Sequence, residues 1–221
     1  MAGGTGCITA MITWFRDDTR MQTQSNYLNE KEYLAIERKA PYKSEYFGGK
    51  MLAISGARRA HSLILVNLGA SLHAQLRSRP FEVYLGDMRV HASAKAKGFY
   101  TYPDVSVVNS QPHFADGQFD TLLNPVFLAE VLSESTERYD RGRKFELYQS
   151  IPSLSEYLLV ASDHIRVDLY TRQANGKWLL TSASSLEETL AIDSMCCKLS
   201  LADLYDKVQF EEGAEDQNRF L

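Results

Sequence analysis

The segment Val126-Phe127-Leu128-Ala129-Glu130-Val131-Leu132 decides the fold, because an unbroken apolar run of this length is typical of a strand buried on both faces. Glu130 is the one charged residue within it. A buried carboxylate is costly unless a cation or a metal ion neutralises it. The run therefore predicts a central strand, together with an acid that has a partner inside the protein.

A second, shorter apolar run lies upstream and opens with an acid. Asp104 directly follows Pro103 and begins the sequence Asp104-Val105-Ser106-Val107-Val108. Two acids on neighbouring strands can share a divalent metal ion. Downstream of Glu130, a polar segment with a helical pattern carries Asp140 and Lys144 four residues apart, so both side chains leave one face of a helix.

Two acids and a lysine are the parts of a metal-dependent phosphodiesterase. We expect Asp104 and Glu130 to be the metal ligands, and Lys144 to be the cation that stabilises a hydroxide and the developing negative charge. Each residue also has a plainer interpretation. Asp104 can start a strand or cap a turn, and a buried arginine can neutralise Glu130. Lys144 can pair with Asp140 along a helix face, an interaction worth about 0.3–0.5 kcal/mol.

Length and charge bound the class of protein. With 221 residues, of which 44% are hydrophobic, the chain can form one sizeable core, and we expect one domain. A formal charge of −4 argues against coating nucleic acid through bulk electrostatics. Several basic clusters are compatible either with a solvated face or with a nucleic-acid substrate. These clusters are Arg58-Arg59, Lys95 with Lys97, and Arg138, Arg141, Arg143 and Lys144.

The sequence also indicates the compartment. No apolar stretch approaches the roughly 20 residues needed to cross a bilayer, and the start lacks the pattern of a secretory signal. We therefore expect a soluble, cytoplasmic protein without a membrane partner. Cys7, Cys196 and Cys197 have no spacing that suggests a disulfide framework or a structural zinc site.

Local patterns predict a mixed α/β order in three parts. Residues 1–28 are expected to be a disordered leader, in which Met21 is an alternative start, residues 29–210 a domain, and residues 211–221 an acidic tail. Asn29 and Glu32 form a predicted capping box. Helices are expected over about 30–39, 60–77, 135–149 and 201–207, strands over 81–85, 88–92, 104–108, 126–132 and 156–161, and hairpins over 43–54 and 165–182.

Four groups of residues together resemble the Uma family of restriction endonucleases, within the PD-(D/E)XK nuclease superfamily. They are Tyr102-Pro103-Asp104-Val105, Ala129-Glu130-Val131-Leu132-Ser133, Asp140 with Lys144 and Tyr148, and Glu156-Tyr157-Leu158-Leu159-Val160. The resemblance runs from about Tyr27 to Phe210. It implies a restriction-endonuclease-like mixed sheet flanked by helices with added β-hairpins, DNA as substrate, Mg²⁺ or Mn²⁺ as cofactor, and a product with a 5′ phosphate.

The resemblance assigns the acids more firmly than the lysine. It implies that Pro103-Asp104 is the first signature element and that Glu130 is the acid of the second. The superfamily usually places a lysine two residues after that acid, where this chain has Leu132. Similar families move the lysine to the following helix, which makes Lys144 the candidate and leaves catalytic competence open.

Two upstream residues also match the family. Glu45 resembles the acid before the family's Asp-Gly turn, although Gly48 replaces the usual aspartate. His61 occupies the start of the long helix, where the family usually has a histidine that could hydrogen-bond the metal-site carboxylates or the scissile phosphate. A helix-start histidine bonded to the backbone is an equal alternative.

The leading hypothesis is a Mg²⁺-dependent DNA endonuclease that hydrolyses phosphodiester bonds with metal-activated water. Leu132 and the mildly acidic charge favour an alternative, a nuclease-fold binding or structural protein without turnover. A metal-dependent hydrolase of a small phosphorylated substrate is a third possibility. We expect a homodimer, because cutting both strands of a duplex calls for two sites related by symmetry.

Overall fold

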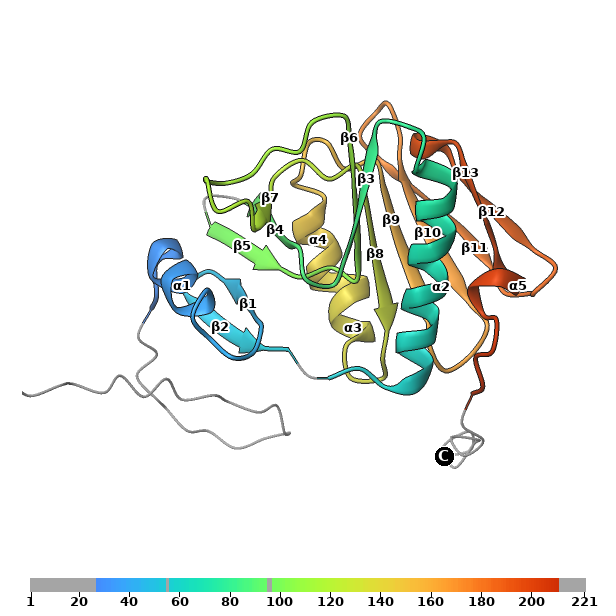
Figure 1. Ribbon diagram of the computed structural model, residues 1–221, viewed down its shortest axis with the longest axis horizontal. Coiled ribbons are helices and arrows are strands. Elements are labelled where there is room, and N and C mark those ends of the chain that lie inside the picture. The colour runs from blue at the N-terminus through green and yellow to red at the C-terminus, as the bar shows by residue number, and fades with distance from the viewer. Residues whose placement is uncertain (1–26, 55, 95–96, 211–221) are drawn as a thin grey trace, which may run out of the picture.

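The computed structural model describes residues 27–54, 56–94 and 97–210. The expectations for the leader up to residue 26 and for the acidic tail lie outside this part of the chain. Figure 1 shows two main sheets side by side, with α2 in front of the larger one. No helix in the described ranges is long and apolar enough to cross a lipid bilayer.

The Glu130 strand lies inside a six-stranded sheet of order β11-β10-β9-β8-β6-β3. β8 (Phe127–Leu132) is buried at every position, as its apolar sequence predicts. It pairs antiparallel with β6 (Val105–Asn109) and parallel with β9 (Glu156–Ala161). The prediction that the strands following Asp104 and bearing Glu130 are neighbours is confirmed.

The two margins of this sheet are formed differently. β3 (Phe81–Leu85) pairs with β6 at one margin. At the other margin, β10 (Val167–Arg172) and β11 (Trp178–Ala183) form the predicted hairpin. Gly176 adopts a φ of 79° in the turn, a conformation that favours glycine.

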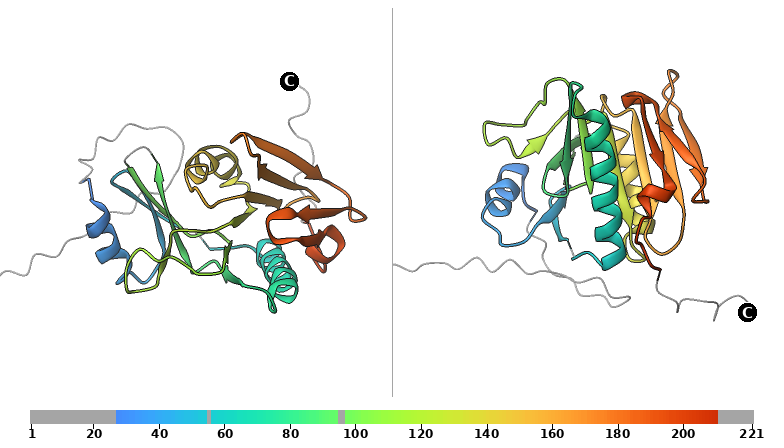
Figure 2. Two further views of the ribbon diagram at one scale, coloured as in Figure 1. Left: turned by 90° about the horizontal axis from the view of Figure 1, so that it is seen from above. Right: turned by 45° about the vertical axis from the view of Figure 1, so that its right-hand side comes forward.

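Helices cover both faces of the six-stranded sheet (Figure 2, left). On one face, α2 (Arg59–Leu76) buries Ile64, Leu68, Leu72 and Leu76. β12 (Thr189–Ile192), β13 (Cys197–Ser200) and α5 (Leu201–Leu204) share that core. On the other face lie α3 (Glu137–Tyr139), a π-helical turn (Asp140–Lys144) and α4 (Phe145–Tyr148). The helix expected over about 135–149 is present as these three consecutive segments, but a π-turn that was not predicted forms its middle.

A five-stranded sheet of order β2-β1-β5-β4-β7 lies beside the larger sheet. Its strands are β1 (Ser44–Phe47), β2 (Lys50–Ala53), β4 (Arg89–Ala94), β5 (Lys97–Thr101) and β7 (Thr121–Leu122). The β1–β2 hairpin was predicted, whereas β5 was not. Consecutive strands β3 and β4 belong to different sheets, because the chain leaves one sheet and enters the other at Gly86-Asp87.

α1 (Glu30–Glu37) packs against the five-stranded sheet through stacked tyrosines. The capping box of Asn29 and Glu32 is present, as predicted. Tyr33 lies against Tyr46 and Tyr100, with ring centroids 4.9 and 5.3 Å away. This small aromatic core holds β1 and β5 in place, and these two strands contribute side chains to the site described next.

Candidate active site

Lys144 lies among three buried carboxylates. Its Nζ atom is 3.0 Å from Glu45 Oε1, 3.0 Å from Glu130 Oε1 and 3.4 Å from Asp140 Oδ1. All four side chains are buried. The structure thus brings together Glu45, Glu130 and Lys144, and the buried partner of Glu130 is a lysine, whereas the pattern also allowed an arginine.

The two sheets and the helical layer each contribute part of this cluster. Along β8, Phe127, Ala129 and Val131 face the core under α2, so Glu130 faces the side covered by the π-turn and α4. Glu45 comes from β1 of the other sheet. Since these elements are far apart in sequence, the cluster forms only when both sheets and the helical layer meet.

The π-turn that carries Asp140 and Lys144 is tied to the sheet at two points. Tyr157 of β9 donates a hydrogen bond to the Asp140 carbonyl oxygen at 3.2 Å. Arg141 Nη1 donates to Asp168 Oδ2 of β10 at 2.6 Å. Single π-turns within α-helices are rare and occur often at functional sites. The two contacts hold this wide turn against the sheet and so set the position of Lys144.

Two hydroxyl groups complete the surroundings of the acids. Tyr148 donates from its hydroxyl to Glu130 Oε1 at 2.8 Å, and Thr101 Oγ1 donates to Glu45 Oε1. Neither residue was assigned to the site from sequence, and Asp140 was considered only as a helical partner of Lys144. Tyr148 follows Lys144 by four residues, which is a usable signal. The sequence contains no comparable signal for Thr101, because the strand that carries it was not predicted.

Asp104 lies at the start of β6, next to the cluster. Its Oδ2 atom accepts a hydrogen bond from the Val131 backbone N–H at 2.7 Å and lies 3.2 Å from His61 Nε2. The register pairs Val105 with Ala129, so Asp104 lies beside Glu130. His61, near the start of α2 as predicted, contacts a carboxylate and is not bonded to the helix backbone through Nε2.

The local charges shift several pKa values. Burial raises the pKa of Glu130 well above its ordinary value, with Asp140, Asp104 and Glu45 adding to the effect and Lys144 opposing it. Burial likewise raises the pKa of Asp140. For Lys144, burial alone would lower the pKa, but Glu130 and Glu45 raise it well above its ordinary value. Three carboxylates around one ammonium group therefore favour retention of an extra proton.

The same balance of charge acts on His61. Burial alone would lower its pKa, but the hydrogen bond and charge of Asp104 raise it. The imidazole therefore keeps its proton to higher pH than a free histidine does. It can neutralise part of the charge on Asp104.

The chemistry of Asp104 and Glu130 fits a hard divalent cation. Asp104 Oδ2 and Glu130 Oε1 receive the hydrogen bonds and ion pairs given above, whereas Asp104 Oδ1 and Glu130 Oε2 accept no hydrogen bond from residues 27–54, 56–94 or 97–210. Mg²⁺ prefers oxygen ligands and can bind one or two carboxylates, water and substrate phosphate. Within those ranges, no three His, Cys, Asp or Glu side chains form a metal-binding group. The two acids suit an open site.

A solved structure shares this architecture. The crystal structure of "a putative nuclease belonging to DUF820" from Anabaena variabilis matches with a TM-score of 0.65, over 79% of this chain and 96% of that chain. The two sequences are 18% identical, so the likeness concerns the fold. The predicted restriction-endonuclease-like α/β fold is confirmed.

Two cyanobacterial proteins are similar in sequence. "Uncharacterized protein sll1609" of Synechocystis sp. is 37% identical over 154 residues, which cover 70% of this chain and 86% of that protein. "Uncharacterized protein slr1290" of the same organism is 34% identical over 183 residues, which cover 83% and 94%. The model of the Uma2 family, described as "Putative restriction endonuclease", matches residues 30–202 and so spans every site residue named above. The chain belongs to the Uma2 family.

Proposed function

We propose that this chain is a DNA endonuclease that hydrolyses phosphodiester bonds with a divalent ion, Mg²⁺ or Mn²⁺, held by Asp104 and Glu130. It would act on cytoplasmic DNA as a homodimer. The observation that carries the proposal is the Lys144 ammonium group, 3.0 Å from the Glu130 carboxylate inside a Uma2 fold. A lysine beside a metal-binding acid can contact the phosphate that the metal also binds.

The charge state of Lys144 indicates its role. The bound ion would supply a hydroxide near neutral pH and neutralise charge on the phosphoryl oxygens. Lys144 has a raised pKa and is protonated at neutral pH, so it can donate hydrogen bonds to the scissile phosphate. It is therefore a stabiliser of negative charge, and a general base would need a pKa close to neutrality.

Two neighbouring residues orient the proposed ligands. His61 contacts Asp104 Oδ2, and Tyr148 donates to Glu130 Oε1. These contacts constrain each carboxylate while a second oxygen is available to a ligand. Such second contacts commonly set the orientation and affinity of metal-binding side chains.

A cleavage assay tests the proposal. Purified protein is incubated with supercoiled and linear duplex DNA in Mg²⁺ or Mn²⁺. We expect nicking or cutting by the natural sequence, and a loss of at least about 100-fold in Asp104→Asn and Glu130→Gln, in line with removal of charge stabilisation from other active sites. Glu146→Gln is the matched control, because Glu146 is exposed and pairs with Arg143 at the surface. Activity that survives both test substitutions would belong to a contaminant.

Two observations favour the alternative of a nuclease-fold binding protein without turnover. Lys144 is shared among three carboxylates, and the strand position usually occupied by lysine is Leu132. Calorimetric titration with Mn²⁺ separates the two functions. The enzyme should bind the ion and lose binding in Glu130→Gln, whereas absence of binding in the natural sequence would support the alternative.

A further inference from the structure

β11 forms an exposed outer margin of the six-stranded sheet (Figure 2, right). Leu179 and Leu180 are 55% and 46% exposed, and residues 178–183 include neither a charge nor a proline. Edge strands usually carry such residues, because they prevent pairing with another chain. The opposite margin follows this rule, since Pro80 precedes β3 and Glu82 lies within it. β11 therefore differs from a protected edge.

The hairpin geometry shows which backbone groups of β11 point outward. Gln173 N–H donates to Lys177 O at 2.7 Å, and the register then pairs Thr171 with Leu179 and Leu169 with Thr181. Hydrogen-bonded and non-bonded pairs alternate in an antiparallel ladder. The odd-numbered residues of β11 therefore bond to β10. The backbone groups of Trp178, Leu180 and Ser182 point away from β10, and no pairing beyond β11 exists in the described part of the chain.

We propose that the β11 edge binds the β11 edge of a second copy of this chain, antiparallel and across a two-fold axis at Leu180. In this register Leu180 lies opposite Leu180 of the second copy, and Trp178 lies opposite Ser182. Every outward-pointing residue then meets another outward-pointing residue, as a two-fold interface requires. The two six-stranded sheets become one continuous sheet. The inference specifies an interface for the homodimer proposed above; it rests on β11 and the residues next to it and does not depend on catalysis.

Charges at the two ends of β11 complement one another in this register. Lys177 is exposed and lies opposite Ala183 of the second copy. Ser184 and Ser185 directly follow Ala183. Their backbone N–H groups donate hydrogen bonds to the Glu188 carboxylate, at 2.8 and 2.9 Å. The positive end of one strand thus approaches the negative end of the other. Trp178–Ala183 itself has no charged residue at the axis, where a like charge would face its own copy.

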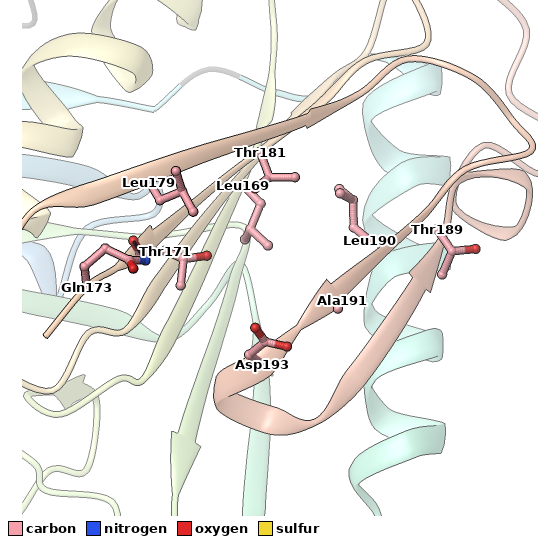
Figure 3. A pocket seen from close by; sticks show the side chains of 9 residues that line it. All are labelled: Leu169, Thr171, Gln173, Leu179, Thr181, Thr189, Leu190, Ala191 and Asp193. Atoms are coloured by element: carbon pink, nitrogen blue, oxygen red, sulfur yellow. Dashed lines mark hydrogen bonds between the residues drawn. The ribbon is translucent and has the colours of Figure 1, made fainter.

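A groove lined by both apolar and polar side chains adjoins the same edge. It has a volume of about 390 Å³ and is lined in part by Leu169, Leu179 and Thr181 on the sheet and by Leu190 on β12. Figure 3 shows these side chains between the sheet and β12. In the proposed register, Leu179 lies opposite Thr181 of the second copy. The two grooves would then meet at the axis, so that the exposed Leu179 side chains are covered.

The solution mass of the full chain tests the interface. We expect a species of twice the chain mass in light scattering and sedimentation across a dilution series. Leu180→Lys places two ammonium groups opposite each other and should raise the dissociation constant by at least about 100-fold, because like charges facing each other cost several kcal/mol. Val66→Lys is the matched control, since Val66 is 62% exposed on α2, and it should remain dimeric.

A crosslinking experiment covers the case in which the lysine variant fails to fold. Opposite Cα atoms in a hydrogen-bonded pair lie about 5.5 Å apart, a separation that a disulfide can span. With Cys7 and Cys196 replaced by serine, Leu180→Cys should form a covalent dimer on oxidation and Val66→Cys should not. A monomeric natural chain, a dimer that survives Leu180→Lys, or crosslinking that is no greater at position 180 than at 66 would each overturn the proposal.

Discussion

Burial, together with the carboxylates of Asp140, Asp104 and Glu45, favours the protonated form of Glu130 more strongly than Lys144 opposes it. Because its folded-state pKa lies above the ordinary value of 4.5, the folded protein binds more protons than the unfolded chain above that pH. The favourable contribution of Glu130 to the free energy of unfolding is therefore fully present below pH 4.5. It is lost as the pH rises through the folded-state pKa of Glu130.

We accordingly predict that Glu130→Gln becomes more stable relative to the natural sequence as the pH rises above about 4.5. Glutamine has no proton to lose, so the difference in the free energy of unfolding should grow by up to about 1.4 kcal/mol per pH unit until the folded-state pKa is passed. Urea unfolding of Glu130→Gln and of the natural sequence across a pH series measures this difference in the free energy of unfolding. Glu146→Gln is the matched control, because Glu146 is exposed and pairs with Arg143 at the surface. A pH-independent difference for Glu130→Gln would contradict the pKa shift.

The need for a partner at Glu130 was easier to predict from the sequence than the identity of the residues that surround it. An acid inside an apolar run must be neutralised, which made Glu130 identifiable from local pattern alone. Lys144 was identified from its spacing to Asp140 and Glu45 through family resemblance, and in the structure Lys144 contacts both Glu45 and Glu130. Thr101 could not be found, because its contact with Glu45 joins residues on two separate strands that only the folded sheet makes adjacent.

Among the secondary-structure elements, the π-turn is the least regular and the most closely tied to the site. Arg141 lies on this turn and pairs with Asp168, whose side chain is 1% exposed. We predict that Arg141→Met lowers the free energy of unfolding by about 1–3 kcal/mol, because it removes a charged hydrogen-bond donor from a buried carboxylate. If the turn sets the position of Lys144, turnover in the cleavage assay should fall more than the Michaelis constant changes.

Arg143 provides the comparison on the same turn. It pairs with Glu146 at the surface, and both side chains are exposed. Arg143→Met should change stability by no more than about 0.5 kcal/mol, because exposed ion pairs contribute little. Chemical denaturation measures the stability of Arg141→Met and Arg143→Met, and steady-state kinetics measures their turnover and Michaelis constants. Equal losses in both would mean that the Asp168 contact has no special part in holding the turn.

Secondary structure was predicted correctly where it follows from a local sequence pattern. It was missed where it depends on pairing with other strands. The β8 run, the capping box at Asn29 and the Asn175-Gly176 hairpin all follow from short-range rules. β5 was missed because its strand character depends on β1 and β4 on either side. The π-turn was missed because Asp140 and Lys144 keep a spacing of four whether the turn is α or π.

On the scale of the whole molecule, charge distribution should govern how strongly DNA is bound. The formal charge is −4, and the residues after Phe210 carry four acids and one arginine, a net of −3. The rest of the chain is therefore near −1. Like charge repels the phosphate backbone over distances set by the Debye length, about 30 Å at 0.01 M salt and about 8 Å at 0.15 M.

We predict that a chain ending at Phe210 binds duplex DNA more tightly than the full chain at low salt. Three net charges would repel a phosphate at about 10 Å by roughly 1 kcal/mol in water, or about fivefold in affinity, and the difference should fall to about twofold or less near 0.15 M salt. Fluorescence anisotropy in a chelating buffer measures binding without cleavage. A full-length variant with the four tail acids replaced by their amides separates charge from length. It should match the shortened chain, and a tail effect that persists in high salt would exclude electrostatic repulsion as its cause.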